Sequence, residues 1–344
     1  MKAVVFSEHG GPEVLSYTEV PDPVVGTNEV LVRVRACALN HLDLWIRKGL
    51  PGISVPLPHI LGSDISGDVA RVGAEVNGLA AGEKVLLLPG ISCGNCAQCA
   101  AAKESQCRDY TLFGYMVDGG YAEYVKAPAG NVIPMPPNLS YEEAAAIPLV
   151  FVTAWHMLIT RANLKPAEEV LVLGAGSGVG SAAIQIAKVA GARVIATART
   201  EEKLAKAKEL GADDTILHSK QDISAEVKRL TNRRGVDVVF EHVGEATWEK
   251  SIRSLAVGGR LVTCGATTGY EGKIDIRYLF TRQISILGSY MGGKAELLSV
   301  LELVSRGAVR PVIDRIFPLA EAADAHRHLE SREQFGKVVL RVAP

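Results

Sequence analysis

Two hydrophobic patterns divide the chain. In residues 1–150, apolar and polar positions alternate with period two, as in Val30–Ala36, and Gly and Pro separate the short runs. This alternation predicts half-buried β-strands in an irregular β-rich region. From Val170 onward, short continuous apolar runs alternate with segments of helical composition, which predicts buried parallel strands joined by helices.

The second region has the pattern of a doubly wound α/β fold. We expect strands near residues 170–173, 193–197, 215, 236–240, 260–264 and 284–287, and helices near 181–190, 201–210 and 224–231. Six such strands complete a sheet that binds its ligand at the carboxyl ends of the strands. The loops after the fourth and fifth strands, which contain Val243 and Gly265, are therefore expected to border nicotinamide and ribose.

A glycine-rich segment follows the first of these strands. The run Gly174–Gly180 is expected to hold a pyrophosphate, because glycine lets the backbone approach closely and a helix start offers free N–H groups. When the dinucleotide fingerprint is aligned on Gly180, its first two glycine positions hold Ala175 and Ser177, so the loop is a variant. The predicted cofactor-binding residues here are Ala175, Ser177, Gly178, Val179 and Gly180.

The end of the second strand indicates which dinucleotide binds. NAD-binding loops usually place an acid there, whereas this chain has Ala198 and Arg199, with Lys203 one helical turn later. Two cations favour a 2′-phosphate, so Arg199 and Lys203 are predicted to bind NADPH. Glu201 and Glu202 leave NAD(H) open, although acids in the first turn of a helix also interact favourably with its dipole.

Four of the six cysteines are closely spaced. Cys93, Cys96, Cys99 and Cys107 form a Cys-x2-Cys-x2-Cys-x7-Cys array in a loop, which we assign to residues 90–110. Four thiolates suit a tetrahedral zinc ion that leaves no position for substrate, so one structural zinc per chain is predicted. Disulfides and an iron–sulfur cluster are the alternatives, and disulfides are disfavoured in a chain without a signal sequence.

Composition and charge exclude several classes of protein. Of the 344 residues, 48% are hydrophobic and 22% are charged, which is typical of a globular protein. The formal net charge is −1 and basic runs are absent, so we expect a small-molecule substrate and no nucleic-acid partner. The longest apolar stretch is too short and too interrupted to span a membrane, and a cytoplasmic protein is expected.

Several motifs resemble those of one enzyme family. The segments Gly10–Val14, Asn40–Arg47 and Gly178–Lys188 resemble the quinone oxidoreductase branch of the medium-chain dehydrogenase/reductase family, and the cysteine loop resembles its zinc alcohol dehydrogenase branch. The resemblance covers essentially the whole chain. It implies a GroES-like catalytic domain of residues 1–150 and 291–344 and a Rossmann domain of residues 151–290.

The resemblance also locates the positions where zinc alcohol dehydrogenases hold a catalytic metal. They correspond here to Asn40, Ser63, Asp64 and Leu149. Catalytic zinc needs about three protein donors, and Asp64 alone does not supply them. The proton-relay hydroxyl of alcohol dehydrogenases is also replaced, by Leu42. An alternative metal site built from Cys37, His41, His59 and Asp64 stays open, and with it a zinc-dependent alcohol dehydrogenase.

Without a metal, the resemblance implies an NADPH-dependent reductase of quinones, enones or enoyl thioesters. Hydride addition to such compounds leaves a delocalised enolate that hydrogen bonds can hold. Asn40 is the predicted donor, although asparagine at this point can also cap a helix that starts at His41. Asp43 and Asp64 complete the predicted catalytic set, and water, Tyr121 or His41 is the expected proton source.

The resemblance implies three further features. Thr153 is expected to face the nicotinamide, although a threonine in a buried helix can also bond to its own backbone. Lys337, in a segment like the family's closing strand, is expected to approach the cofactor phosphate. The stretch Ile284–Tyr290 resembles an edge strand through which relatives pair, so a homodimer or homotetramer is predicted. A non-catalytic NADPH-binding sensor is the second alternative.

Overall fold

The computed structural model describes residues 1–342, which form two compact units. Unit 1 comprises Met1–Leu149, Gly292–Arg306 and the described residues from Arg310 onward, and unit 2 comprises Val150–Met291 and Gly307–Val309. The unit boundaries fall at residues 149/150 and 291/292, against the expected 150/151 and 290/291, and residues 307–309 also belong to unit 2. Among the helices of the described chain, none combines the length and apolar character needed to cross a bilayer.

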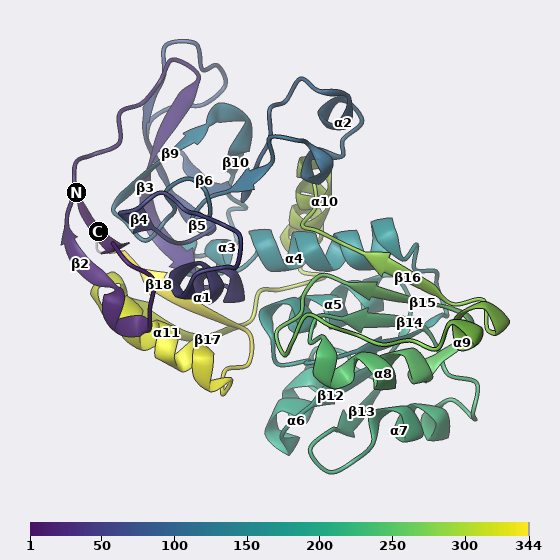
Figure 1. Ribbon diagram of the computed structural model, residues 1–344. Helices are drawn as coiled ribbons and strands as arrows, with labels where there is room; N and C mark the ends of the chain where they lie inside the picture. Colours follow the sequence, from purple (N-terminus) through teal and green to yellow (C-terminus); the bar gives the residue numbers. More distant parts are fainter. Residues whose placement is uncertain (343–344) are drawn as a thin grey trace. The chain divides into compact units, whose positions relative to one another are not determined.

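Unit 1 is built on β-sheets (Figure 1). A seven-stranded sheet has the order β10-β6-β5-β3-β18-β17, with β9 also paired to β3, and a smaller sheet has the order β2-β1-β4. The alternation predicted for Val30–Ala36 lies within β3, whose even-numbered positions are buried. One apolar cluster joins these strands to the helix α11 and contains Val32, Val34, Leu87 and Leu340.

The strands of unit 1 are β1 Lys2–Phe6, β2 Ser16–Glu19, β3 Glu29–Ala38, β4 His59–Ile60, β5 Asp64–Val72, β6 Lys84–Leu87, β7 Gly90–Ile91, β8 Thr111–Leu112, β9 Tyr124–Pro128, β10 Val132–Pro134, β17 Ile313–Pro318 and β18 Lys337–Arg341. Its helices are α1 His41–Lys48, α2 Ala97–Ala100, α3 Tyr141–Ala145, α10 Lys294–Ser305 and α11 Ala322–Ser331, with short turns η1 Pro12–Val14, η2 Glu104–Gln106, η3 Ala129–Asn131 and η5 Leu319–Glu321.

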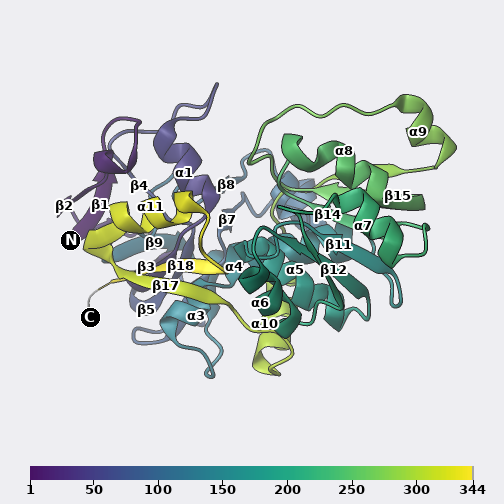
Figure 2. The same cartoon turned by 90° about the horizontal axis from the view of Figure 1, so that it is seen from below.

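Unit 2 is a doubly wound sheet. Its six parallel strands have the order β13-β12-β11-β14-β15-β16. The helices α5 and α6 cover one face of this sheet, and α7 and α8 cover the other (Figure 2). The core contains Leu171, Ile195, Val239 and Leu261 from four adjacent strands. The predicted fold class, an α/β Rossmann domain with a β-rich GroES-like domain, is therefore confirmed.

The strands of unit 2 are β11 Glu169–Val172, β12 Arg193–Ala198, β13 Asp214–Leu217, β14 Val236–Glu241, β15 Leu255–Thr263 and β16 Ser285–Gly288. Its helices are α5 Gly178–Val189, α6 Glu201–Glu209, α7 Ile223–Leu230, α8 Glu245–Ser254 and α9 Ile276–Thr281. The helix α4 Pro148–Trp155 begins at the unit boundary and continues into a π-helical turn, η4 His156–Arg161.

Two element boundaries differ from expectation. The helix expected from residue 181 begins at Gly178, because Ser177 caps it by accepting a hydrogen bond from the Gly180 N–H at 2.9 Å. The strand expected from residue 260 begins at Leu255, because the chain pairs with β14 across a register shift before the apolar run. Both signals lie in local geometry that hydrophobic periodicity does not report.

Candidate functional site

Three segments of unit 1 bring Asn40, Asp64 and Lys337 together. Asn40 lies between β3 and α1, Asp64 begins β5 and Lys337 begins β18. The strand β3 pairs antiparallel with both β5 and β18, and its Ala38 lies opposite Asp64 on one side and Val339 on the other. Sheet register therefore places the three side chains at the same end of adjacent strands.

Their polar atoms form a closed hydrogen-bonded cluster. The Lys337 ammonium donates to Asp64 Oδ2 at 2.7 Å and to Asn40 Oδ1 at 2.6 Å. Asn40 Nδ2 donates to the same Asp64 Oδ2 at 2.9 Å. The other carboxylate oxygen, Asp64 Oδ1, accepts a hydrogen bond from the Leu149 N–H at 2.7 Å. We call Asn40, Asp64 and Lys337 the ammonium cluster.

The ammonium cluster is buried, and its one positive and one negative charge are paired. Asp64 has no exposed surface, whereas Lys337 and Asn40 are 3% and 7% exposed. An isolated buried carboxylate would carry a large desolvation penalty, so the ammonium compensates its charge. The sequence prediction placed Lys337 near the cofactor phosphate; in this structure its two partners lie within unit 1, and the phosphate contact stays a prediction.

The residues at the positions implied for a catalytic metal do not fit a divalent ion. Ser63 Oγ donates to the Phe113 carbonyl at 2.7 Å, and Leu149 contributes a backbone N–H, which is a donor and no ligand. Asn40 and Asp64 are already bonded to the Lys337 ammonium. Zinc in proteins is held by Cys, His and carboxylate ligands, and this set supplies one of them, the Asp64 carboxylate, which is paired with a cation.

The alternative metal site also lacks the required geometry. Within residues 1–342, the one group of three or more Cys, His, Asp or Glu side chains close enough to hold an ion is the cysteine array. Cys37 is buried beside Tyr121 and Gly62, and His59 packs edge-on against Phe6. Cys37, His41, His59 and Asp64 therefore do not gather at one point.

Asp43 fixes the loop ends that carry the ammonium cluster. Its Oδ2 accepts from the Asn40 N–H at 2.7 Å and its Oδ1 accepts from the Gly62 N–H at 3.1 Å. Burial raises the pKa of Asp43 to about 6. Asn40 is the N-cap residue of α1 as anticipated, but its side chain makes no capping hydrogen bond and serves the cluster instead.

A second buried network in unit 1 was missed by sequence reasoning. His326 on α11 contacts the Tyr121 hydroxyl through Nε2 at 3.1 Å and the Arg47 guanidinium through Nδ1 at 3.0 Å. Arg47 is fully buried and pairs with Glu330 at 2.6 Å. Burial and the Asp43 carboxylate raise the pKa of Tyr121 well above its ordinary value, which makes it a poor proton source.

The four cysteines gather at one point of the loop after β7. Cys96 and Cys99 sulfurs lie 3.6 Å apart, Cys93 and Cys107 sulfurs 3.5 Å apart, and Cys93 and Cys99 sulfurs 3.9 Å apart. Tetrahedral Zn–S bonds of roughly 2.3 Å imply sulfur separations of roughly 3.8 Å. All four thiols are free of disulfides, so this donor set fits one structural zinc ion.

In unit 2, hydrogen bonds within the glycine loop, residues 174–180, and to the neighbouring strand fix its conformation. Ser177 Oγ donates to the Gly174 carbonyl at 2.8 Å, and the Ala175 N–H donates to the Thr197 carbonyl at 2.9 Å. A Cβ on Gly180 would lie 2.3 Å from the Gly174 oxygen, so only glycine fits there. The first N–H groups of α5, at Gly178 and Val179, have no intrahelical acceptor and suit a phosphate.

Two buried residues at the end of β14 support this loop and its neighbour. His242 Nε2 contacts the Leu173 carbonyl at 2.8 Å, and burial lowers the His242 pKa. Glu241 has no exposed surface, and its carboxylate accepts from the N–H groups of Val243 and Gly244 and from two hydroxyls. Neither residue was among the predicted cofactor-binding residues, because an acid or imidazole at the end of an apolar strand carries no sequence motif.

Of the other predicted cofactor residues, Val243 and Gly265 lie in the loops after β14 and β15, and Thr153 lies in α4. The Val243 carbonyl accepts from the Thr268 hydroxyl at 2.7 Å, which joins the two loops after β14 and β15. A Cβ on Gly265 would lie 3.1 Å from the His242 carbonyl. Thr153 is 5% exposed, and its hydroxyl lies 3.9 Å from the Met291 sulfur rather than on its own backbone. Their cofactor contacts stay predictions.

The end of β12 carries an exposed cation and no acid. Arg199 follows Ala198 directly, and its side chain makes no ion pair with the described residues. His218 lies beside it, with Nδ1 3.3 Å from the Thr197 hydroxyl. Burial lowers the His218 pKa, and the positive charge of Arg199 lowers it further. Lys203 lies in the first turn of α6, which Thr200 caps at 3.3 Å.

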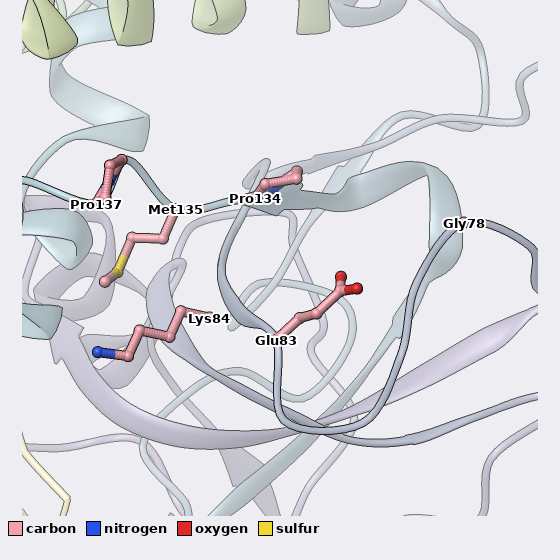
Figure 3. A pocket seen from close by; sticks show the side chains of 6 residues that line it. All are labelled: Gly78, Glu83, Lys84, Pro134, Met135 and Pro137. Atoms are coloured by element: carbon pink, nitrogen blue, oxygen red, sulfur yellow. The ribbon is translucent and has the colours of Figure 1, made fainter.

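A surface hollow of unit 1 contains none of these residues. It is lined by Gly78, Glu83, Lys84, Pro134, Met135 and Pro137 and measures about 560 Å³ (Figure 3). The Glu83 carboxylate and the Lys84 ammonium extend in different directions within it. The hollow offers no set of converging polar groups, so we assign it no chemistry.

Comparisons with known proteins agree with this architecture. The model of an alcohol dehydrogenase GroES-like domain matches residues 26–137, and that of a zinc-binding dehydrogenase matches residues 178–306. A solved structure of an NAD-dependent alcohol dehydrogenase is 50% identical over the full length of both chains, with a TM-score of 0.97.

Two curated relatives of similar identity to this chain are named as different kinds of oxidoreductase. An NAD-dependent alcohol dehydrogenase of Sulfolobus acidocaldarius is 35% identical over 99% of this chain and 100% of its own. An acryloyl-coenzyme A reductase of Metallosphaera sedula is 33% identical over 99% of each chain. The chain therefore belongs to the medium-chain dehydrogenase/reductase superfamily, and the predicted family is confirmed. It is an oxidoreductase of the alcohol dehydrogenase superfamily.

Proposed function

We propose that this protein is an NADPH-dependent reductase of activated C=C bonds or quinones that works without a catalytic metal. The observation that carries the proposal is the ammonium cluster, in which Lys337 compensates the charge of Asp64 at the positions where the family resemblance implies a metal. Alcohol oxidation produces an alkoxide whose localised charge a metal ion stabilises well. Conjugate reduction produces an enolate, for which a fixed hydrogen-bond donor suffices.

Residues of unit 2 would hold the dinucleotide. The N–H groups of Gly178 and Val179 would bind the pyrophosphate, with Ser177 closing the loop. The loop containing Val243, held by Glu241, would border the nicotinamide ribose. When bound, the cofactor supplies a hydride from its dihydronicotinamide ring. The four cysteines would hold a structural zinc ion away from this chemistry.

The preference for NADPH over NADH is supported by the charge at the end of β12. Arg199 is exposed and lacks an ion-pair partner among the described residues, and no acid stands where an NAD ribose would be bound. A guanidinium forms strong charge-assisted hydrogen bonds with a phosphate. The relatives named as NAD-dependent enzymes favour the opposite preference, so paired measurements with both cofactors are needed.

One assay distinguishes the proposal from its alternatives. We expect the zinc-loaded protein to oxidise NADPH with 2-cyclohexen-1-one, a quinone or crotonyl-coenzyme A, and to leave simple alcohols unoxidised with NADP⁺. Activity that alcohols alone support, and that a chelator abolishes before the protein unfolds, would favour an alcohol dehydrogenase. Tight NADPH binding with no turnover on any of these compounds would favour the sensor.

We also infer that copies of the chain pair through β16. This four-residue strand is the last of its sheet and pairs on one side only, with β15, within the described residues. An unpaired edge presents free N–H and C=O groups to a second strand. Replacing Ile286 on this strand by Pro should shift the mass measured by light scattering toward that of a monomer.

A further inference from the structure

We propose that the Lys337 ammonium, rather than the Asn40 amide, holds the developing negative oxygen of the substrate. The ligand class is a conjugated carbonyl compound, whose oxygen becomes an enolate as hydride arrives. This inference rests on the proposed function, since it names the electrophile of that reaction. It also reassigns Lys337 from the predicted cofactor phosphate to the substrate.

The hydrogen bonds of the cluster favour Lys337 over Asn40 as the donor to a substrate oxygen. An ammonium has three N–H donors, and two of them reach Asp64 and Asn40. No third partner of Lys337 occurs within residues 1–342. The Asn40 amide is more fully used: Oδ1 accepts from Lys337, and Nδ2 donates to Asp64 at 2.9 Å and toward the Ala38 carbonyl at 3.4 Å. Lys337 therefore retains a donor for a ligand.

The exposure of the cluster is graded. Asp64 is completely buried, while Lys337 and Asn40 retain 3% and 7% of their surface. The small exposed surface of the cluster therefore belongs to Lys337 and Asn40 and not to Asp64. A ligand oxygen that reaches the cluster from solvent would contact these two residues rather than the carboxylate.

The lysine is also held in place before any ligand arrives. A free lysine side chain loses considerable conformational freedom when it binds, but here Asp64 and Asn40 already fix the ammonium. Asp64 is in turn fixed by the Leu149 N–H, and the Asn40 backbone by Asp43. Asp64 and Asn40 are therefore positioning residues, and fixed donors in a dry environment stabilise a new charge most effectively.

The reaction balances without a metal. Bound NADPH would supply the hydride that forms the new C–H bond at the β-carbon and would thereby become NADP⁺. The C=C π electrons form the new double bond to the carbonyl carbon, and the carbonyl π electrons move to oxygen. Lys337 donates a hydrogen bond to that enolate oxygen, and a proton from water then adds to the α-carbon. The products are NADP⁺, the saturated carbonyl compound and the hydroxide that water leaves behind.

The test uses the Lys337→Met/Asp64→Asn double variant, which removes one positive and one negative charge together and so leaves the net charge of the site unchanged. We expect the rate of NADPH oxidation by 2-cyclohexen-1-one to fall about 100-fold in single-turnover measurements. The dissociation constant for NADPH should stay within about twofold of the wild-type value. Lys126→Met removes an exposed lysine of the same unit and serves as the matched control.

Two results would overturn the inference. A double variant that keeps the wild-type single-turnover rate would remove Lys337 from the chemistry. A variant whose slower rate is fully restored by saturating NADPH would return Lys337 to the cofactor phosphate. A circular dichroism spectrum and melting curve like those of the wild type show that the double variant is folded.

A binding measurement separates this inference from the proposed function. With NADP⁺ bound, the wild-type protein should bind 4-nitrophenol as the yellow phenolate, and the double variant should lose this absorbance at equal protein concentration. Lysine-dependent phenolate binding without enone or quinone reduction would support the oxyanion site and contradict the reductase. Absence of phenolate binding to the wild-type protein would contradict the oxyanion site.

Discussion

The Lys337 ammonium lies 2.7 Å from the Asp64 carboxylate, although 273 positions separate the two residues in the sequence. Both are buried, so each depends on the other for charge compensation. Lys337 begins β18 and Asp64 begins β5, and β3 lies between these two strands in the sheet. The closing strand of the chain therefore completes a site whose other residues lie within the first 65 positions.

Removing one member of this pair should destabilise the protein more than removing both. Lys337→Met leaves a buried carboxylate unpaired, and we expect it to cost about 3 kcal/mol. In Lys337→Met/Asp64→Asn the unpaired charge is gone, and most of that loss should be recovered. Urea unfolding measures the free energy of unfolding of the wild type, both single variants and the double variant. These four values give the coupling energy between Lys337 and Asp64. Additive losses in the double variant would show that the two charges do not depend on each other.

Acid should destabilise the protein through His326. Burial, reinforced by the Arg47 charge, lowers its pKa to about 3, so the native state keeps it neutral. The unfolded chain takes up a proton near the ordinary histidine pKa, so stability falls as pH decreases from about 6.5 toward 3. We expect His326 to account for about 3 kcal/mol of the loss between pH 7 and pH 4.

The His326→Asn variant isolates this contribution, because its amide oxygen can accept the Arg47 hydrogen bond without titrating. The stability difference between wild type and variant should shrink as pH falls. His328→Asn, on the same helix α11, controls for the loss of an imidazole that lies near the surface. A stability difference that does not change between pH 7 and pH 4 would contradict a neutral, buried His326.

Zinc should be structural and present once per chain. Cys107 is the buried member of the array, and the other three cysteines are partly exposed. Cys107→Ser removes one of the four thiolates, so it should prevent tight zinc binding at the array. We expect the zinc content to fall from one to near zero per chain and the melting temperature to drop. Atomic emission spectrometry after dialysis measures the zinc content per chain. Two zinc ions per wild-type chain would contradict the metal-free ammonium cluster.

Cofactor preference should depend on Arg199. Replacing it by Gln removes the exposed guanidinium at the end of β12, and we expect the KM for NADPH to rise about tenfold while that for NADH changes little. Arg277→Gln, an exposed arginine of the same unit, is the matched control. An equal change in both KM values would show that Arg199 does not contact the 2′-phosphate.

Much of this fold follows from local signals in the sequence. The period-two alternation of Val30–Ala36 and the apolar run at Val170–Leu173 correspond to β3 and β11, because burial on one or both faces fixes those patterns. The cysteine spacing also predicted a compact four-sulfur site, because short steps along a loop bring the thiols together.

The sequence predicted only part of the ammonium cluster. Family resemblance placed Asn40 and Asp64 at one site, but the partner of Asp64 depends on the register between β18 and β3, which no local pattern encodes. The buried Glu241 and His326 were missed for a related reason. Their partners come from other segments, and an isolated polar residue beside apolar ones is ambiguous until the tertiary contacts are known.

Glu241 should control the cofactor loop after β14. Its carboxylate accepts the N–H groups of Val243 and Gly244, along with the Ser251 hydroxyl at 2.5 Å. Glu241→Gln keeps the shape but turns one acceptor into a donor, so a hydroxyl or N–H loses its partner. We expect the dissociation constant for the nicotinamide cofactor to rise about tenfold, which corresponds to about 1.4 kcal/mol. Glu249→Gln, an exposed change on α8, should leave it unaltered. Unchanged cofactor binding in Glu241→Gln, measured by fluorescence titration, would show that this network stabilises the fold without setting the cofactor loop.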